Sequence, residues 1–297
     1  MEEKENSLLI ACDNGDEKQV KSLVEQGANV NLMDEFNGYK HTPLDLACKH
    51  GYDTIVKYLV EQGADVNKKA LQTPLCVACE YGHETIVKYL EDYEADVNLE
   101  SYGSSPLNEA CKNGHETIVK YLVERGADVN LECSGYFPLS EACENGHETI
   151  VKYLVDHGVD VNLECYGYYP LTDACENGYE TIVKYLVEHS ADVNKKVYQT
   201  LLCAACEGGH ETIVKYLVDH GADVNIEYND SIPLIEACKN GNETIVKYLV
   251  ERGVDVNKET LQTPLCVASE YGHETIVKYL VDHGADVNLE CYYNSTP

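Results

Sequence analysis

Residues 169–178 read Tyr-Pro-Leu-Thr-Asp-Ala-Cys-Glu-Asn-Gly, and variants of this stretch recur through the whole chain. Leu171, Ala174 and Cys175 stand at i, i+3 and i+4, the spacing that places them on one face of a helix. Proline is favoured at the first helical position, and glycine is favoured just past the last one. The stretch therefore predicts a short helix that opens at the proline and ends at the glycine.

A second helix is expected after each of these stretches. Residues 148–155, Glu-Thr-Ile-Val-Lys-Tyr-Leu-Val, are almost unchanged from copy to copy. Ile150, Val151 and Leu154 form an apolar stripe at helical spacing. The glutamate and lysine of this segment are four residues apart, and such a pair supports a helix by about 0.2–0.5 kcal/mol. The Gly-Ala-Asp-Val-Asn that follows is expected to leave the helix, and about nine residues of extended loop lead to the next Pro-Leu.

The Pro-Leu dipeptide recurs at a regular step of 31 or 32 residues. It begins at Pro43, Pro74, Pro106, Pro138, Pro170, Pro233 and Pro264, and Leu201-Leu202 takes its place in the one gap. In three copies a threonine precedes the proline and is expected to cap the helix: Thr42, Thr73 and Thr263. By length alone, 297 residues would suggest about two domains. The regular period shows that the repetition belongs to the fold and is not due to chance.

The consensus of the copies is Thr-Pro-Leu-x-x-Ala-Cys-x-x-Gly-His, then Ile-Val-Lys-Tyr-Leu-Val, then Gly-Ala-Asp-Val-Asn. It resembles the ankyrin repeat, and the resemblance covers essentially the whole chain. The resemblance implies an all-α solenoid of nine stacked antiparallel helix pairs, with projecting hairpin loops and a concave groove. Two departures stand out. The copies are shorter than the usual length of about 33 residues, and the family's histidine after Pro-Leu is missing from every copy.

We expect a single array over residues 1–297. Its boundaries are expected at 1–40, an atypical capping repeat, and then at 41–71, 72–103, 104–135, 136–167, 168–198, 199–230, 231–261 and 262–294. Residues 295–297 would open a further, truncated repeat. We therefore expect the natural protein to continue beyond Pro297.

The charge of the chain limits its partners. The formal net charge is −30, and nucleic-acid binding depends on lysine and arginine displacing counterions from phosphates. Nucleic acids and anionic membranes are therefore poor partners. No apolar run approaches the roughly 18 residues of a membrane span, and the first residues lack a secretory signal. The expectation is a cytoplasmic, monomeric protein.

The cysteines and histidines have structural explanations. Eight cysteines follow the alanine of a first helix, where a small buried side chain is needed: Cys12, Cys48, Cys79, Cys111, Cys143, Cys175, Cys206 and Cys238. Cys133, Cys165 and Cys291 fall in hairpin loops and are expected to be exposed thiols. The histidines after the glycines are expected to bond backbone groups: His83, His115, His147, His210 and His273. No second ligand pair for zinc, phosphate-binding loop or serine elbow is present. We expect no metal, no cofactor and no enzyme activity.

The copies differ mainly at the hairpin tips and at the outward positions of the first helices, the surface that the family uses for recognition. The partner-binding residues predicted there are Tyr102, Glu109, Tyr136, Phe137, Glu141, Glu144, Tyr166, Tyr168, Tyr169, Asp173, Glu176, Tyr198, Tyr228 and Glu236. Phe137 and Tyr169 take the place of the capping threonine, a local rule broken in two neighbouring copies.

Tyrosines above carboxylates favour cations, because the ring face attracts positive charge and the carboxylate pairs with it. The hypothesis is a non-enzymatic protein–protein interaction scaffold whose concave groove binds a basic peptide or protein. Another protein partner in the same groove, or a spacer role, stays open at this point. The alternative function is a regulatory or targeting segment of a larger enzyme, channel or effector that continues beyond Pro297.

Overall fold

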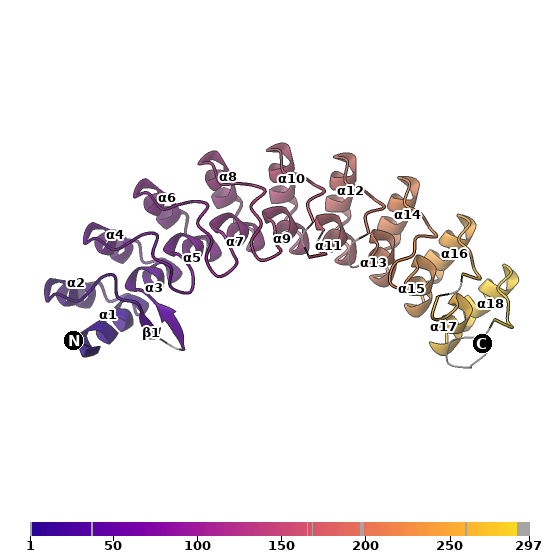
Figure 1. Ribbon diagram of the computed structural model, residues 1–297, viewed down its shortest axis with the longest axis horizontal. Coiled ribbons are helices and arrows are strands. Elements are labelled where there is room, and N and C mark those ends of the chain that lie inside the picture. Colours follow the sequence, from indigo (N-terminus) through magenta and orange to yellow (C-terminus); the bar gives the residue numbers. More distant parts are fainter. Residues whose placement is uncertain are drawn as a thin grey trace. The chain divides into compact units, whose positions relative to one another are not determined.

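A computed structural model describes residues 2–36, 38–164, 166–167, 169–196, 199–258 and 260–289, without the side chains of residues 2–5 (Figure 1). Helix packing divides the chain into two units, unit 1 at Met1–Val159 and unit 2 at Asp160–Pro297. Each unit is described by itself. Within the described residues, the predicted all-α arrangement of helix pairs is confirmed, with eighteen helices and one two-stranded hairpin.

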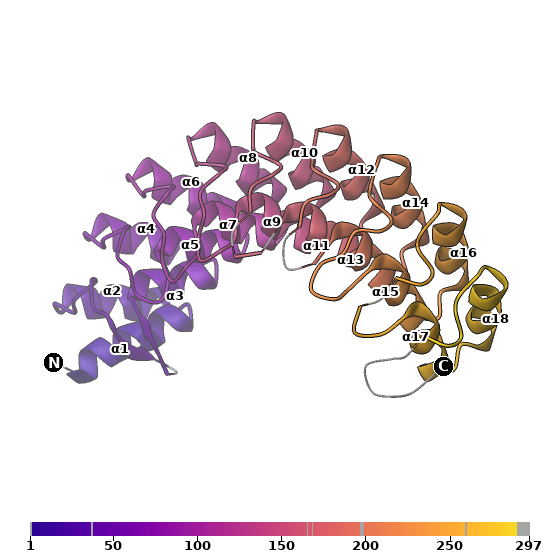
Figure 2. The same cartoon turned by 45° about the vertical axis from the view of Figure 1, so that its right-hand side comes forward.

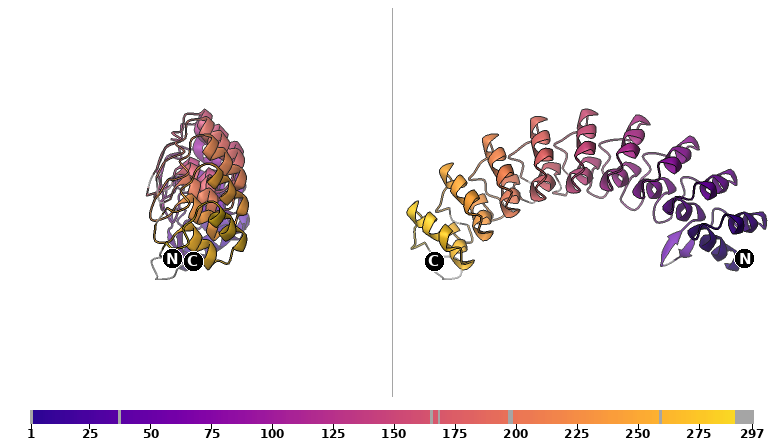
Figure 3. Two further views of the ribbon diagram at one scale, coloured as in Figure 1. Left: turned by 90° about the vertical axis from the view of Figure 1, so that its right-hand side faces the viewer. Right: turned by 180° about the vertical axis from the view of Figure 1, so that it is seen from behind.

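Unit 1 contains five helix pairs and the hairpin. Its elements are α1 (Glu2–Asp13), α2 (Glu17–Glu25), β1 (Asp34–Phe36), β2 (Tyr39–His41), α3 (Pro43–Lys49), α4 (Asp53–Glu61), α5 (Pro74–Glu80), α6 (Glu84–Asp92), α7 (Pro106–Lys112), α8 (Glu116–Glu124), α9 (Pro138–Glu144) and α10 (Glu148–Asp156). The first helices of the pairs pack side by side in one layer, and the second helices form another. The antiparallel hairpin, with Phe36 opposite Tyr39, projects from the first-helix layer (Figure 3).

Unit 2 repeats the same two-layer arrangement. Its elements are α11 (Pro170–Glu176), α12 (Glu180–Glu188), α13 (Leu201–Glu207), α14 (Glu211–Asp219), α15 (Pro233–Lys239), α16 (Glu243–Glu251), α17 (Pro264–Glu270) and α18 (Glu274–Asp282). The loop between α14 and α15 projects beyond the helices (Figure 2). Its tip is a tight turn in which Asn229 and Asp230 both have φ near +50 to +60°, a conformation that asparagine and aspartate tolerate. No described helix of either unit is long and apolar enough to cross a membrane.

The helix caps follow the sequence prediction. The side chains of Thr42, Thr73 and Thr263 each accept a hydrogen bond from the backbone N–H three residues later, and Ser105 and Thr200 do the same. These caps fix the start of α3, α5, α7, α13 and α17, whereas α9, α11 and α15 begin without a side-chain cap bond.

Two repeated contacts hold neighbouring pairs in register. The ring nitrogen Nε2 of His115 lies 3.0 Å from the carbonyl oxygen of Glu80, and the other four histidines of this series make the same contact with the preceding pair. The predicted backbone role of these histidines is thus confirmed. Asn98 donates to the carbonyl of Gly126 at 3.2 Å and accepts from the N–H of Asp128 at 2.8 Å, so it fixes one hairpin loop against the next.

The eight cysteines that follow the alanines are fully buried, as predicted. Eleven of the described cysteines are free thiols, and Cys266 is disulfide-bonded. Cys133 corrects the sequence analysis, because it is buried and not exposed. Its backbone pairs with Tyr136 across a tight turn, and the strand alternation directs its side chain inward, like that of the buried Ser101 at the same place one loop earlier. Cys165 and Cys291 lie outside the described residues.

Candidate functional site

Two carboxylic acids lie on adjacent first helices of unit 1. Glu109 is on α7 and Glu141 is on α9, and these helices pack directly against each other. Both side chains are buried, with only 8% of each residue exposed. Leu107, Ala110 and Cys111 occupy the core face of α7, so helical spacing turns Glu109 toward the outer side of the first-helix layer.

The surroundings of these acids disfavour their charged forms. Burial raises the pKa of Glu109 above its ordinary value, against hydrogen bonds from Ser104 and Gln72 that lower it. The amide Nε2 of Gln72 donates to Glu109 Oε1 at 3.0 Å. Burial raises the pKa of Glu141 further, to about 7, while the ammonium of Lys112 opposes the rise. Near neutral pH, Glu141 is therefore poised between its neutral and charged forms, and an arriving cation would favour the carboxylate.

The aromatic residues above these acids divide into exposed and buried ones. Tyr102 is 81% exposed at the tip of the loop before α7, where its φ is +51°. Tyr136 is half-buried, and Glu144 at the end of α9 is exposed. Glu109, Glu141, Glu144, Tyr102 and Tyr136 together are called the acidic surface of unit 1.

Unit 2 contains a similar group. Asp173 is buried on α11, Glu176 is exposed at the end of that helix, and Tyr166 is exposed in the loop before it. Glu236 on α15 is buried and already accepts hydrogen bonds from Ser231 at 2.8 Å and from the ammonium of Lys239 at 2.9 Å. Together with the half-buried Tyr228, these residues form the acidic surface of unit 2. Tyr168 and Tyr198 lie outside the described residues.

Phe137 and Tyr169, two of the predicted partner-binding residues, are at least as buried as the acids of the same surfaces. Phe137 is buried, and Tyr169 has 0% exposure. The hydroxyl of Tyr169 donates to Asn162 Oδ1 at 3.0 Å and to the carbonyl of Asp192 at 3.3 Å. Both rings take the place of a helix cap and fill the space beneath their loops, and neither makes a side-chain cap bond. Ser140 Oγ and Thr172 Oγ1, three residues on, are also buried and have no hydrogen-bond partner among the described residues.

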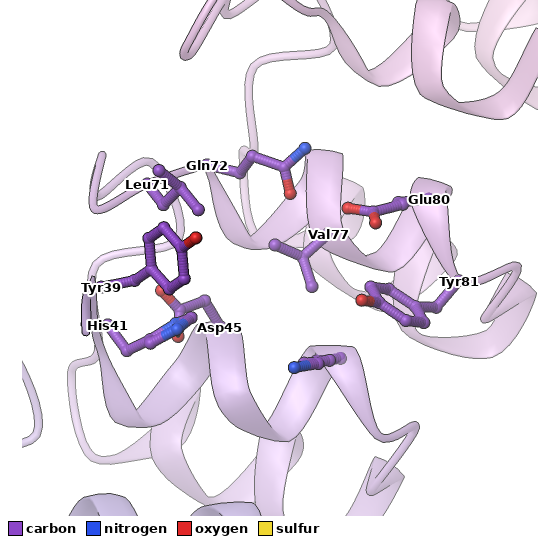
Figure 4. Close-up of a pocket in the computed structure, with 9 residues that line it drawn as sticks. Tyr39, His41, Asp45, Leu71, Gln72, Val77, Glu80 and Tyr81 are labelled. Atoms are coloured by element: carbon purple, nitrogen blue, oxygen red, sulfur yellow. The ribbon is translucent and has the colours of Figure 1, made fainter. Parts of the chain in front are cut away.

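Sequence reasoning missed a pocket of about 320 Å³ at the N-terminal end of the first-helix layer of unit 1 (Figure 4). It is lined by Tyr39, His41, Asp45, Lys49, Leu71, Gln72, Val77, Glu80 and Tyr81. One signal was available. Asp45 replaces the family's histidine, and His41 lies four residues before it. The hairpin that brings Tyr39 over this position had no counterpart in the repeat pattern.

The arrangement does not indicate a metal centre. In the part of the chain that the structure describes, no three His, Cys, Asp or Glu side chains are grouped as a metal ion would require. The paired acids and exposed tyrosines can instead bind cationic groups by charge and by contact with ring faces.

Comparison with known proteins gives one consistent result. Family models described as ankyrin repeats match residues 1–70, 68–133, 131–197, 194–260 and 249–297. Among solved structures, the ankyrin repeat domain of human ASB11 matches with a TM-score of 0.64 and 27% sequence identity. The match covers 73% of this chain and 98% of that one. No curated protein matches the sequence.

Proposed function

Because the chain belongs to the ankyrin-repeat family, whose repeats generally mediate protein–protein interaction, we propose that it is a non-enzymatic scaffold for a basic partner. The partner is a basic peptide or a basic protein face that binds the first-helix layer, in the family's concave groove. Ankyrin-repeat proteins are typically non-enzymatic scaffolds, and that is consistent with the proposal.

One observation carries the proposal, the burial of two carboxyl groups side by side on α7 and α9. A buried carboxylate is costly unless a cation or donor accompanies it. The charge of Glu109 makes ionisation of Glu141 more costly, because it contributes to the raised pKa of Glu141. A lysine or arginine from a partner would offset both charges at once, and its stem could lie against the exposed ring of Tyr102.

The acidic surface of unit 2 offers similar chemistry on a smaller scale. Asp173 and Glu176 lie on one helix, the loop before it carries the exposed Tyr166, and Glu236 has an ammonium partner in Lys239. We therefore expect the stronger contribution from unit 1.

The test uses a fluorescent peptide in which lysines and arginines alternate with small apolar residues, and its affinity is measured by anisotropy. The variant Glu109→Lys/Glu141→Lys is compared with Glu116→Lys/Glu124→Lys, which makes the same charge change on exposed residues of α8. We expect the first variant to lose at least tenfold in affinity at low salt and the second no more than about threefold. The Glu141→Gln variant separates loss of charge from charge reversal.

The control pair decides between local and general attraction. Equal losses in the two double variants would assign the binding to the overall charge of −30 and refute the proposed surface. Unchanged affinity in the α7/α9 variant would do the same. Affinity should also rise between pH 6 and pH 8, because Glu141 must lose its proton to pair with a cation.

A further inference from the structure

The pocket of unit 1 is built by four separate segments. Strand β2 supplies Tyr39 and His41, and α3 supplies Asp45 and Lys49. The loop between α4 and α5 supplies Leu71 and Gln72, and α5 with the residue after it supplies Val77, Glu80 and Tyr81. In Figure 4 the ring of Tyr39 stands above His41 and Asp45 on one side, and Tyr81 faces it from the other, with Val77 between them. A space of about 320 Å³ is at the lower end of the range for small-ligand sites.

Asp45 forms the base of this pocket. The residue is only 3% exposed. Its Oδ2 accepts the backbone N–H of Thr42 at 3.0 Å as part of the helix cap. Its Oδ1 is shielded from solvent, and Nδ1 of His41 lies 3.3 Å from it. Burial raises the pKa of this carboxyl above its ordinary value, and the contact with His41 opposes the rise. A buried carboxylate is costly without a cation, so a cation that enters the pocket would stabilise the charged form.

The walls of the pocket suit a flat cation. Tyr39 is 59% exposed and Tyr81 is 44% exposed, so both rings are accessible to an incoming group. Val77 and Leu71 provide apolar surface for a hydrocarbon stem. Glu80 adds a second carboxylate, while Lys49 is the single permanently charged base of the lining. With His41 neutral, the lining has a net charge of −1.

We propose that this pocket receives an arginine side chain of a partner peptide, with the guanidinium directed at the carboxylates of Glu80 and Asp45 and its stem along Val77 and Leu71. Guanidinium combines several donors with a plane that stacks on tyrosine, and it is less strongly hydrated than ammonium. An acidic group would face Asp45 and Glu80, and an apolar group would leave both carboxylates without a cation. Neither alternative uses what the pocket offers.

A second hollow supports a peptide, and not free arginine, as the source. A space of about 550 Å³ adjoins the pocket and shares Tyr39 and Leu71 with it. Lys40, Lys69 and the exposed Tyr102 also line this space, so the residues flanking an arginine have a surface to lie on. The pocket adjoins the acidic surface of unit 1 through Gln72, but the inference does not require that surface to bind anything.

The test is an amide chemical-shift titration of the full ¹⁵N-labelled chain. The probes are acetyl-Gly-Gly-Arg-Gly-Gly-amide, the same peptide with citrulline or lysine in place of arginine, and free arginine. We expect shifts from the arginine peptide in residues 39–49 and 71–81. Citrulline, which is neutral, should bind at least tenfold more weakly, lysine several-fold more weakly, and free arginine more weakly than the peptide. Equal binding of the citrulline and arginine peptides, or shifts confined to other regions, would overturn the proposal.

Variants assign the effect to the pocket. Asp45→Asn and Glu80→Gln should each lower the affinity for the arginine peptide at least fivefold, whereas Glu124→Gln on α8 should leave this affinity unchanged. If Asp45→Asn perturbs the cap of α3 and lowers the melting temperature, Glu80→Gln and Tyr81→Leu decide the matter, because neither residue is a core residue. Retained affinity in both would refute the inference. The shifts of residues 39–49 and 71–81 report this pocket alone, so this test can fail or succeed independently of the proposed function.

Discussion

Replacing Glu141 by glutamine should stabilise the protein at alkaline pH and have little effect at acidic pH. The residue is buried on α9, and burial raises its pKa from the ordinary 4.5 to about 7. The folded protein therefore holds this proton more tightly than the unfolded chain does. The resulting stabilisation is fully present below pH 4.5 and is lost as the pH rises through 7. Glutamine is neutral throughout and does not lose it.

The size of the effect follows from the difference between the two pKa values. The gap between 4.5 and about 7, at about 1.4 kcal/mol per pH unit, corresponds to roughly 3 kcal/mol. Part of this is lost to solvent screening at the edge of the helix layer, so about 1–3 kcal/mol is expected. The quantity to compare is the change in unfolding free energy on substitution at pH 8 minus that at pH 5. This subtraction removes any cost of the glutamine that does not depend on pH.

The assay is urea unfolding, followed by circular dichroism and by tyrosine fluorescence, for the wild-type and Glu141→Gln chains at pH 5, 6, 7 and 8. The two signals must coincide, because repeat arrays can lose two-state behaviour. Glu124→Gln, on an exposed residue of α8, serves as the matched control. A difference between pH 8 and pH 5 that is no larger for Glu141→Gln than for this control would refute the reasoning.

Three further substitutions test the packing by urea unfolding. Gly114 has φ +75°, and a Cβ there would lie 2.6 Å from the ring of His147. Gly114→Ala should therefore lower the free energy of unfolding by more than about 1 kcal/mol. Adding His147→Ala should restore only part of this stability, and full recovery would mean that the positive φ causes no strain. Tyr169→Phe removes the hydroxyl contacts inside unit 2 and should cost about 1 kcal/mol, and no loss would contradict their role. Leu122→Ala, in the fully buried stripe of α8, should lower the free energy of unfolding by about 2–5 kcal/mol. The loss should exceed that of Val123→Ala on the same helix, and equal losses would contradict the assignment of Leu122 to the core.

The helix pairs could be predicted from the sequence because each depends on local features repeated along the chain. The proline at the first helical position, the threonine before it and the glycine after the helix act within one turn. The apolar stripe and the buried cysteines come from helical spacing alone. The backbone bonding of the histidines could also be anticipated, since a residue repeated without a catalytic companion most simply bonds backbone. That the carbonyl belongs to the preceding pair was not predicted.

The loops could not be predicted in this way, because one residue of offset reverses the direction of a side chain in extended backbone. Tyr136 and Phe137 are adjacent, yet the first is half-buried and the second is buried. The side chain of Cys133 was expected to be exposed but is buried, because its direction in the loop could not be predicted from the sequence. Sequence difference between copies therefore located the variable region but could not separate contact residues from loop core.

Phe137 and Tyr169 show that a broken local rule is not by itself a functional signal. Each ring is buried at the position where other copies have a cap threonine. Burial of apolar area is favourable by itself, so packing explains these two rings without a partner. Asp45 is the opposite case. It keeps its cap, and packing alone does not explain a carboxylic acid at the base of an open pocket.

The same distinction applies to Glu141, and it links stability to binding. A hydrophobic residue at this position would remove the cost of a buried carboxyl group, as the apolar Val77 does at the corresponding position of α5. If Glu141→Gln both stabilises the chain at pH 8 and weakens the binding of the basic peptide, the charge of Glu141 lowers the stability of the wild-type chain and also raises its affinity for the peptide. If it stabilises the chain and leaves the peptide unaffected, the acid is not part of a recognition surface. The basic-partner proposal would then have to move to the pocket at Asp45, where charge and shape are matched by a different set of residues.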